Sequence, residues 1–288
     1  MTHTVTVGGN GVEEITISNE HPFVLISGPC AIESRDIAMQ AAEELVKITQ
    51  ELGIPYIYKS SFDKANRTSA GGKRGTGMDE GLKILQEIRD TFKVPVLTDL
   101  HESAQAKPVG EVVDVLQIPA FLCRQTDLLL ACGETGKAVN VKKGQFLAPE
   151  DMAKVADKIA STGNKNILLT ERGTTFGYNN LVVDMRSMPI MKKTGYPVVM
   201  DATHSVMMPA AHGDASGGKR EFVEPLSRAA AAIGVGAFFM EAHPNPAQAF
   251  SDKETQIPID KMKELLQVVV KIDEISKNTA YRNIPNAA

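Results

Sequence analysis

The hydrophobic positions of the chain fall into eight short apolar runs, most of them separated by stretches with helical spacing. The stretch 35–52, for example, places Ile37, Ala41, Leu45 and Ile48 about one helical turn apart. The apolar runs predict strands at 23–29, 56–62, 94–100, 115–121, 138–143, 167–173, 197–203 and 237–242. The intervening stretches predict helices over 35–52, 78–92, 126–132, 149–161, 225–233 and 260–277.

Strand–helix alternation of this kind indicates a parallel β-sheet, which is either an open doubly wound sheet or a closed barrel. Almost every apolar run ends in a charged or metal-capable residue, always at its C-terminal end. A barrel gathers functional residues from all its strands on that face, whereas an open sheet collects them at one switch point. We therefore expect an α/β protein with a (β/α)8 TIM barrel.

Two short alternating segments, 4–7 and 14–18, precede the first predicted barrel strand. Gly8, Gly9, Asn10 and Gly11 lie between them and readily adopt positive φ, so residues 1–20 are predicted to contain a β-hairpin. Such a hairpin would close the bottom of the barrel. With no linker or repeat in sight, residues 1–288 are expected to form one TIM-barrel domain.

The composition favours an ordinary globular enzyme or binding protein. A formal net charge of −4 suggests neither nucleic acid nor an anionic membrane surface as a partner. The longest small or apolar stretch, 229–240, is shorter than the roughly 20 residues that span a bilayer, and the N-terminus does not resemble a secretory signal. Three cysteines without a CxxC pair indicate a reducing, cytoplasmic environment.

A metal site is the first chemical hypothesis. Cys30 and Glu241 follow the first and last predicted strands, which are neighbours only if the barrel closes; His204 follows the seventh strand, and Asp252 lies in the last loop. This mixed set of sulfur, nitrogen and oxygen donors suits Zn²⁺, Fe²⁺, Mn²⁺ or Co²⁺. The alternative is that Cys30 is a buried small apolar residue, the role we assign to Cys123 and Cys132.

Cations at the same strand ends indicate an anionic ligand. Lys59, Lys64 and Arg67 fall within ten residues of one another, and four more cations end later strands: Arg124, Lys142, Lys143 and Arg172. Arginine matches phosphate or carboxylate with a planar fork, and lysine supplies a point charge. Surface solvation would explain one or two such residues, but a whole rim of them predicts a multiply anionic ligand.

Two glycine-rich loops resemble phosphate-binding loops only superficially. Gly213–Lys219 fits the GxxxxGK pattern, but Arg220 stands where Ser or Thr would bind Mg²⁺, and no strand leads directly into the loop. We therefore reject a nucleotide site and expect no organic cofactor. The loops around 71–75 and 217–220 are instead predicted to form a mobile lid over the barrel mouth.

Longer motifs connect these residues to a known family. The segments GPCAIES, KSSFDKANRTS, TDLHE, QIPAFLCRQTDLL, NVKKGQF, LTERGTTFGYNNLVVDMRS and DATHSV resemble the 3-deoxy-D-manno-octulosonate 8-phosphate synthases. The resemblance implies a homotetrameric barrel, a transferase that condenses phosphoenolpyruvate with arabinose 5-phosphate and water and releases phosphate, in lipopolysaccharide (Kdo) biosynthesis. The metal-free members have Asn where this chain has Cys30, which implies the metal-dependent form, with Cys30, His204, Glu241 and Asp252 as ligands.

The resemblance also implies roles for the cations. Lys64, Lys142 and Arg172 would bind phosphoenolpyruvate, with Lys59 and Gln117 nearby. Arabinose 5-phosphate would be held by Asn66, Arg67 and the hydroxyls of Thr68 and Ser69, and Asp99 would bind its hydroxyls, while Arg124 would reach the sugar phosphate of a neighbouring subunit. The residues expected to act in catalysis are Lys64, Asp99, His204 and Asp252, of which Asp252, or a metal-bound water, would handle the proton.

Three other activities fit parts of the pattern. A sister synthase uses erythrose 4-phosphate, but it carries Lys-Pro-Arg-Thr-Ser where this chain has KANRTS. A Schiff-base aldolase would use Lys59 or Lys142 as its nucleophile. A barrel that only binds a phosphorylated ligand would have no use for a metal sector with an open position.

Overall fold

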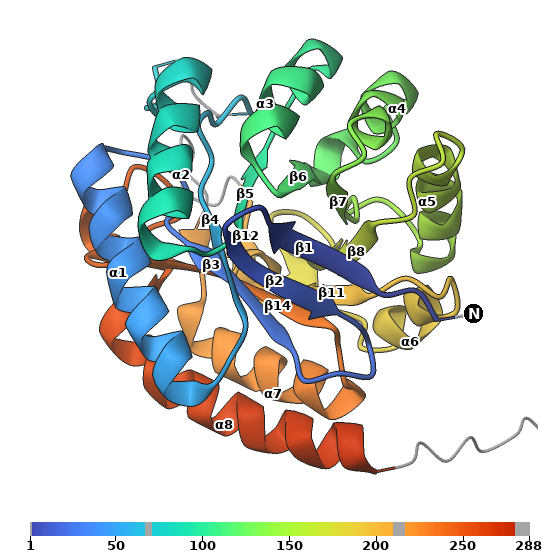
Figure 1. Cartoon of the computed structure of the whole chain (residues 1–288). Coiled ribbons are helices and arrows are strands. Elements are labelled where there is room, and N and C mark those ends of the chain that lie inside the picture. The colour runs from blue at the N-terminus through green and yellow to red at the C-terminus, as the bar shows by residue number, and fades with distance from the viewer. Residues whose placement is uncertain (1, 67–70, 210–216, 280–288) are drawn as a thin grey trace, which may run out of the picture.

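Eight parallel strands close into a barrel in the computed structural model, which describes residues 2–66, 71–209 and 217–279 (Figure 1). The strands are β3 (Val24–Gly28), β4 (Tyr56–Lys59), β5 (Val96–Asp99), β6 (Val115–Ile118), β7 (Ala138–Lys142), β8 (Ile167–Glu171), β11 (Val198–Asp201) and β14 (Ala237–His243). Each pairs in parallel with the next, and β14 pairs with β3 between Glu241 and Gly28 at the closing seam. The TIM-barrel prediction is confirmed.

Helices surround the barrel as the helical spacing predicts. They are α1 (Arg35–Leu52), α2 (Met78–Phe92), α3 (Ala106–Val112), α4 (Thr126–Glu134), α5 (Met152–Ala160), α6 (Ser187–Lys192), α7 (Val223–Ile233) and α8 (Ile259–Asn278). The sequence shows why α1 stops where it does: Ser34 caps its first turn, and Gly53 ends it in the left-handed region at φ 64°. The short helices α3 and α6, which were not predicted, each contain a proline that interrupts the apolar pattern.

Two strands, β4 and β6, end three residues earlier than the apolar runs suggest. β4 stops at Lys59 because the chain turns out of the sheet, where the Ser60 hydroxyl donates to the Pro29 carbonyl at 2.8 Å. β6 stops at Ile118 because Pro119 lacks an N–H, and a single 3₁₀ turn, Ala120–Leu122, follows it.

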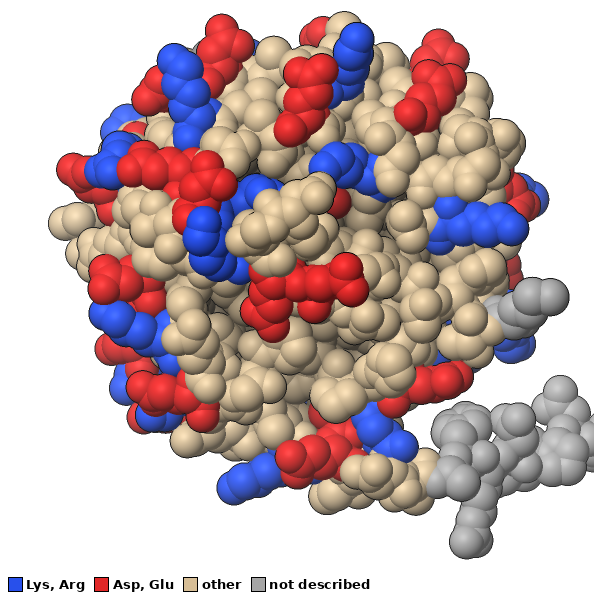
Figure 2. Space-filling model, in the orientation of Figure 1, with Lys and Arg blue, Asp and Glu red and all other residues tan. Residues whose placement is uncertain are grey.

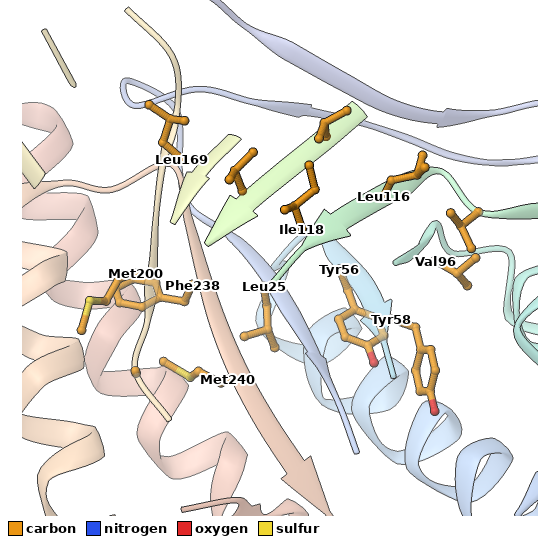
Figure 3. Packing of buried hydrophobic residues seen from close by; sticks show 14 of the residues in the cluster. Leu25, Tyr56, Tyr58, Val96, Leu116, Ile118, Leu169, Met200, Phe238 and Met240 are labelled. Atoms are coloured by element: carbon orange, nitrogen blue, oxygen red, sulfur yellow. The ribbon is translucent and has the colours of Figure 1, made fainter. Parts of the chain in front are cut away.

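Alternation along each strand separates an inner core from an outer one. Side chains at one parity, such as Ile26, Ile57 and Leu97, fill the lower barrel interior, while those at the other parity face the helices. Figure 3 shows part of the outer layer, in which Leu25, Tyr56, Leu116, Leu169 and Phe238 pack in the space between strands and helices.

The predicted hairpin is present and lies across one end of the barrel (Figure 1), built from β1 (Val5–Gly9) and β2 (Val12–Ile17). Its buried side chains Val5, Val7, Ile15 and Ile17 belong to the same cluster as the inner barrel residues, so the hairpin seals the lower end. Gly8 is required at its φ of 91° because a Cβ there would strike the Glu13 carbonyl.

The surface at this end carries acidic and basic side chains intermixed among uncharged ones (Figure 2). This face therefore offers no extended field of one sign to attract a polyanion. Within the described residues, no helix is long and apolar enough to cross a membrane.

Candidate active site and metal centre

The inward-facing residues change from apolar to polar toward the C-terminal ends of the strands. Ile57, Leu97 and Val199 belong to the inner core. Two residues after each of them along its strand lies a buried polar residue: Lys59, Asp99 and Asp201, respectively. Because side chains alternate with a period of two, the same face that builds the dry core also builds this polar floor. The remaining members of the floor are Gln117, Asn140, Lys142, Thr170 and Glu241.

A cavity of about 860 Å³ opens above the polar floor. The sequence-predicted residues that line it are Lys59, Lys64, Asn66, Asp99, Gln117, Lys142, Arg172, His204 and Asp252. Arg124 does not line the cavity and is exposed on the surface. Arg67, Thr68 and Ser69 lie outside the described residues.

The four residues proposed as metal ligands converge at one side of this floor. One atom each from Cys30, Glu241 and Asp252 lies within 4.8 Å of the others, and Cys30 Sγ is 2.9 Å from Asp252 Oδ2. His204 completes the group, since its Nε2 lies 3.6 Å from Glu241 Oε2 and 3.8 Å from Asp252 Oδ2.

The donor set fits a divalent transition metal. Glu241 Oε2 is buried and has no hydrogen-bond partner among the described residues, an arrangement that is costly unless a cation binds it. A thiolate, an imidazole and two carboxylates together favour Zn²⁺, Fe²⁺, Mn²⁺ or Co²⁺ over Mg²⁺ or Ca²⁺.

The ionisation of the metal-site residues follows from their burial and charge. Burial raises the pKa of the Cys30 thiol well above its ordinary value, and the nearby Asp252 and Glu241 carboxylates raise it further. Burial alone would also raise the pKa of Glu241, but His204 and Lys59 bring it down to about 2. The thiol thus needs a bound cation to ionise at neutral pH, whereas Glu241 is already an anion.

Asp201 orients His204 and holds Lys142. Its Oδ2 lies 2.9 Å from His204 Nδ1, its Oδ1 accepts the His204 N–H at 2.9 Å, and Lys142 Nζ donates to it. A carboxylate behind a ligating imidazole fixes the ring and leaves Nε2 facing the metal position. The sequence marks Asp201 only as the end of a strand, so its partnership with His204 was not predicted.

The ammonium groups of Lys59 and Lys142 lie near the aromatic ring of Phe239. Lys142 Nζ lies 3.1 Å from the centroid of Phe239, and Lys59 Nζ lies 5.3 Å from the same ring while donating to Glu241 at 2.7 Å. Burial lowers the pKa of Lys142 to about 8, despite the neighbouring Asp201. The role of Phe239 was missed because an apolar residue inside a buried strand carries no signal of its own.

Lys64 and Arg172 are two further buried cations that line the cavity. Burial disfavours the Lys64 ammonium, but Cys30, Glu241 and other acidic groups nearby raise its pKa above the usual value. Burial lowers the pKa of Arg172, and its Nη1 has no hydrogen-bond partner among the described residues. An unpaired buried guanidinium N–H aimed at a cavity is suited to an anionic ligand.

Asp99 is a buried carboxylate that lines the same cavity. It accepts from the Ser61 hydroxyl and lies 3.3 Å from His101 Nε2. Burial would raise the pKa of Asp99, but the hydrogen bond with His101 and the nearby Lys64 and Lys59 hold it well below its usual range. This ionised carboxylate is placed to accept hydrogen bonds from a hydroxylated ligand.

Gln256 was not predicted as part of the site. Its Oε1 accepts the Cys30 N–H at 3.0 Å, and its Nε2 donates to the Ser251 carbonyl at 2.8 Å. The residue thus ties the Cys30 turn to the loop that carries Asp252. A single Gln in a loop has no sequence pattern that would identify this contact.

Both loop segments of the predicted lid, 71–75 and 217–220, lie within the described residues. Arg74 pairs with Asp63, and the Lys64 N–H donates to the Arg74 carbonyl at 2.8 Å, which ties the 71–75 loop to the cavity wall. Residues 217–218 form a two-residue strand against Met207–Met208. Motion of these loops stays a prediction.

Cys123 and Cys132 are buried and not disulfide-bonded.

Comparison with known proteins gives the family. The chain matches the model of the DAHP synthetase I family over residues 4–278. It is 59% identical over 273 residues to the 2-dehydro-3-deoxyphosphooctonate aldolase of Granulibacter bethesdensis, with 95% of each chain covered. It is 55% identical over 275 residues to the protein of the same name from Geobacter sp. (strain M21), with 96% of this chain and 99% of the relative covered.

A third relative of that name, from Bordetella petrii, is 58% identical over 271 residues, covering 92% of this chain and 95% of its own. These three matches cover 92–96% of this chain. The chain therefore belongs to the DAHP synthetase I family, among relatives named 2-dehydro-3-deoxyphosphooctonate aldolase.

Proposed function

We propose that the protein condenses phosphoenolpyruvate with D-arabinose 5-phosphate and water to give 3-deoxy-D-manno-octulosonate 8-phosphate and inorganic phosphate, a cytoplasmic step of Kdo synthesis for lipopolysaccharide. The names of its relatives support this activity. The observation that carries the proposal is one cavity in which Lys64, Lys142 and Arg172 face a cluster of metal-capable side chains.

The cations would bind the phosphoenolpyruvate anion. Lys64, Lys142 and Arg172, with Lys59 and Gln117 beside them, would neutralise its carboxylate and phosphate, so that a second anion can approach without prohibitive repulsion. Arg172 Nη1 supplies a buried donor that lacks a partner among the described residues.

The sugar would lie across the cavity. Asn66 lines the cavity wall beside Lys64. It would hold the sugar phosphate together with Arg67, Thr68 and Ser69. The ionised Asp99 would accept hydrogen bonds from sugar hydroxyls and so fix the aldehyde over the C3 carbon of phosphoenolpyruvate.

In the proposed reaction, C3 of phosphoenolpyruvate attacks the aldehyde carbon and water adds at C2; the tetrahedral intermediate then loses phosphate by C–O cleavage. Asp252, at the edge of the cavity, would receive the proton of the water, and His204 would be held in position by Asp201. A divalent metal bound by Cys30, His204, Glu241 and Asp252 would supply Lewis-acid polarisation of the aldehyde oxygen or of the water.

The quaternary structure is part of the proposal. Arg124 is exposed and does not line the cavity of its own chain, which suits a residue that completes the sugar-phosphate site of a neighbour in a homotetramer. Phe121 and Phe146 are 57% and 61% exposed and offer apolar area for such a contact. Light scattering of the purified protein would give a mass four times that of the chain.

Phosphate release and product mass test the activity. Metal-loaded protein given phosphoenolpyruvate should release phosphate with arabinose 5-phosphate and much more slowly with erythrose 4-phosphate. A faster reaction with erythrose 4-phosphate would assign the sister activity instead. Borohydride trapping of an adduct on Lys59 or Lys142 would replace the proposed mechanism with Schiff-base chemistry. Binding of phosphoenolpyruvate without turnover would favour a binding protein.

A further inference from the structure

Glu33 joins two segments that carry candidate metal ligands. It lies three residues after Cys30, and its Oε1 accepts the N–H of Phe250 at 2.6 Å, two residues before Asp252. The Glu33 side chain is only 4% exposed, so little water competes for this acceptor. The short bond holds the Phe250 backbone closely.

His243, at the end of the barrel strand β14, also lies close to the Glu33 carboxylate. Its Nδ1 accepts the Asn245 N–H at 2.9 Å, and its Nε2 lies 3.5 Å from Glu33 Oε1. His243 ends β14 two residues after Glu241. Glu33 therefore stands where the segments of Cys30, Glu241 and Asp252 meet.

The backbone of Asp252 needs such support. Its φ of 51° lies in the left-handed region, which is uncommon for residues other than glycine. Conformations of this kind persist only when the surroundings impose them. The Asp252 carbonyl accepts from the Thr255 and Gln256 N–H groups on its C-terminal side, and the Glu33 bond to Phe250 fixes the chain on its N-terminal side.

We propose that Glu33 is a positioning residue for the metal centre, which acts by holding the Phe250–Asp252 backbone so that the Asp252 carboxylate stays next to Cys30. Glu33 does not belong to the cluster of metal-capable side chains formed by Cys30, Glu241 and Asp252, and its Oε1 accepts the Phe250 N–H. The inference rests on the metal centre proposed above. It assigns part of the metal affinity to a residue outside the four-ligand set.

Cobalt titration of the metal-free, full-length protein tests this role. Co²⁺ bound to the Cys30 thiolate gives a sulfur-to-cobalt charge-transfer absorption, which reports binding without any turnover. We expect Glu33→Ala to weaken Co²⁺ binding about 10- to 100-fold, the usual effect of losing a residue that supports metal ligands. Glu33→Gln keeps an oxygen acceptor for the Phe250 N–H and should bind nearly as tightly as the unmodified protein.

A matched control separates positioning from general destabilisation. Asn164 makes a similar buried tie, from its Nδ2 to the Gly133 and Lys137 carbonyls, and does not line the cavity. Asn164→Leu should lower stability without changing Co²⁺ affinity. Amide hydrogen exchange in the 249–252 segment should rise in Glu33→Ala and stay unchanged in Asn164→Leu. If Glu33→Ala does not fold, Glu33→Met takes its place in the experiment, because methionine keeps the volume of the side chain but has no oxygen to accept the Phe250 N–H.

The outcomes distinguish the two proposals. Absence of the charge-transfer band in the unmodified protein would overturn the metal centre itself. A normal band in that protein, with equal Co²⁺ affinity in Glu33→Ala and Glu33→Met, would leave the metal centre standing and overturn the role of Glu33. Equal loss of affinity in Glu33→Gln and Glu33→Ala would also overturn it, because the hydrogen bond to Phe250 would then not be the cause.

Discussion

Asp201 contacts His204 through both oxygens of its carboxylate: Oδ2 lies 2.9 Å from the ring Nδ1, and Oδ1 accepts the backbone N–H at 2.9 Å. The same carboxylate receives Lys142 Nζ. One buried anion thus connects His204, a proposed metal ligand, to Lys142, a proposed ligand of the phosphoenolpyruvate anion. Loss of its charge is expected to affect both sides at once.

Asp201→Asn tests that connection. An amide in this position keeps the size of the side chain but removes the charge that orients His204, so we expect metal affinity and kcat/KM each to fall about 10- to 100-fold. Steady-state kinetics and metal titration would measure the two effects. Asp184→Asn, which neutralises a surface carboxylate paired with Arg186, is the control and should change neither.

Lys142 should cause kcat/KM to decline on the basic side of the pH profile. Its pKa of about 8 in the free protein means that the ammonium loses its charge as pH rises through that value, so kcat/KM for phosphoenolpyruvate should decline above about pH 8. Lys142→Arg keeps the charge to higher pH and should move this decline upward. A pH profile of kcat/KM that is the same for both proteins would assign the decline to another group.

Lys277 should stabilise the lower end of the barrel. Its Nζ donates to the carbonyls of Asn19, His21 and Val235 and so ties α8 to the segment that follows the hairpin. Lys277→Met removes this donor from two partly buried hydrogen bonds, to Asn19 and Val235, and from one exposed bond, to His21. We expect a loss of about 2–3 kcal/mol in the free energy of unfolding.

Urea denaturation would measure the loss at Lys277. Lys271→Met, an exposed change on the same helix, should cost much less. Equal midpoints for the two variants would show that the carbonyl contacts contribute little.

The barrel was predictable because period-two alternation and repeated strand–helix units leave few topologies open. The same geometry brought Lys59, Asp99, Lys142 and Glu241 to one floor, since each lies at the C-terminal end of a strand. The helices α3 and α6 were missed because they are short and proline-containing, so their amphipathic pattern is weak.

The contacts that position the site were less predictable. The bonds of Asp201 to His204, of Gln256 to Cys30 and of Glu33 to Phe250 depend on where loops lie in space. Loop paths follow from local hydrogen bonds and unusual φ values such as that of Asp252, which leave no periodic signal in a sequence. Strand ends could therefore be assigned to the site, whereas their supporting residues could not.

Phosphate release from phosphoenolpyruvate and arabinose 5-phosphate, measured before chelation, after complete metal removal and after return of a divalent metal, tests the central claim most directly. The account predicts release that is lost on chelation and restored by Zn²⁺, Fe²⁺, Mn²⁺ or Co²⁺, and a Cys30→Ala protein that remains nearly inactive throughout. Full activity after complete metal removal, or in Cys30→Ala, would contradict it.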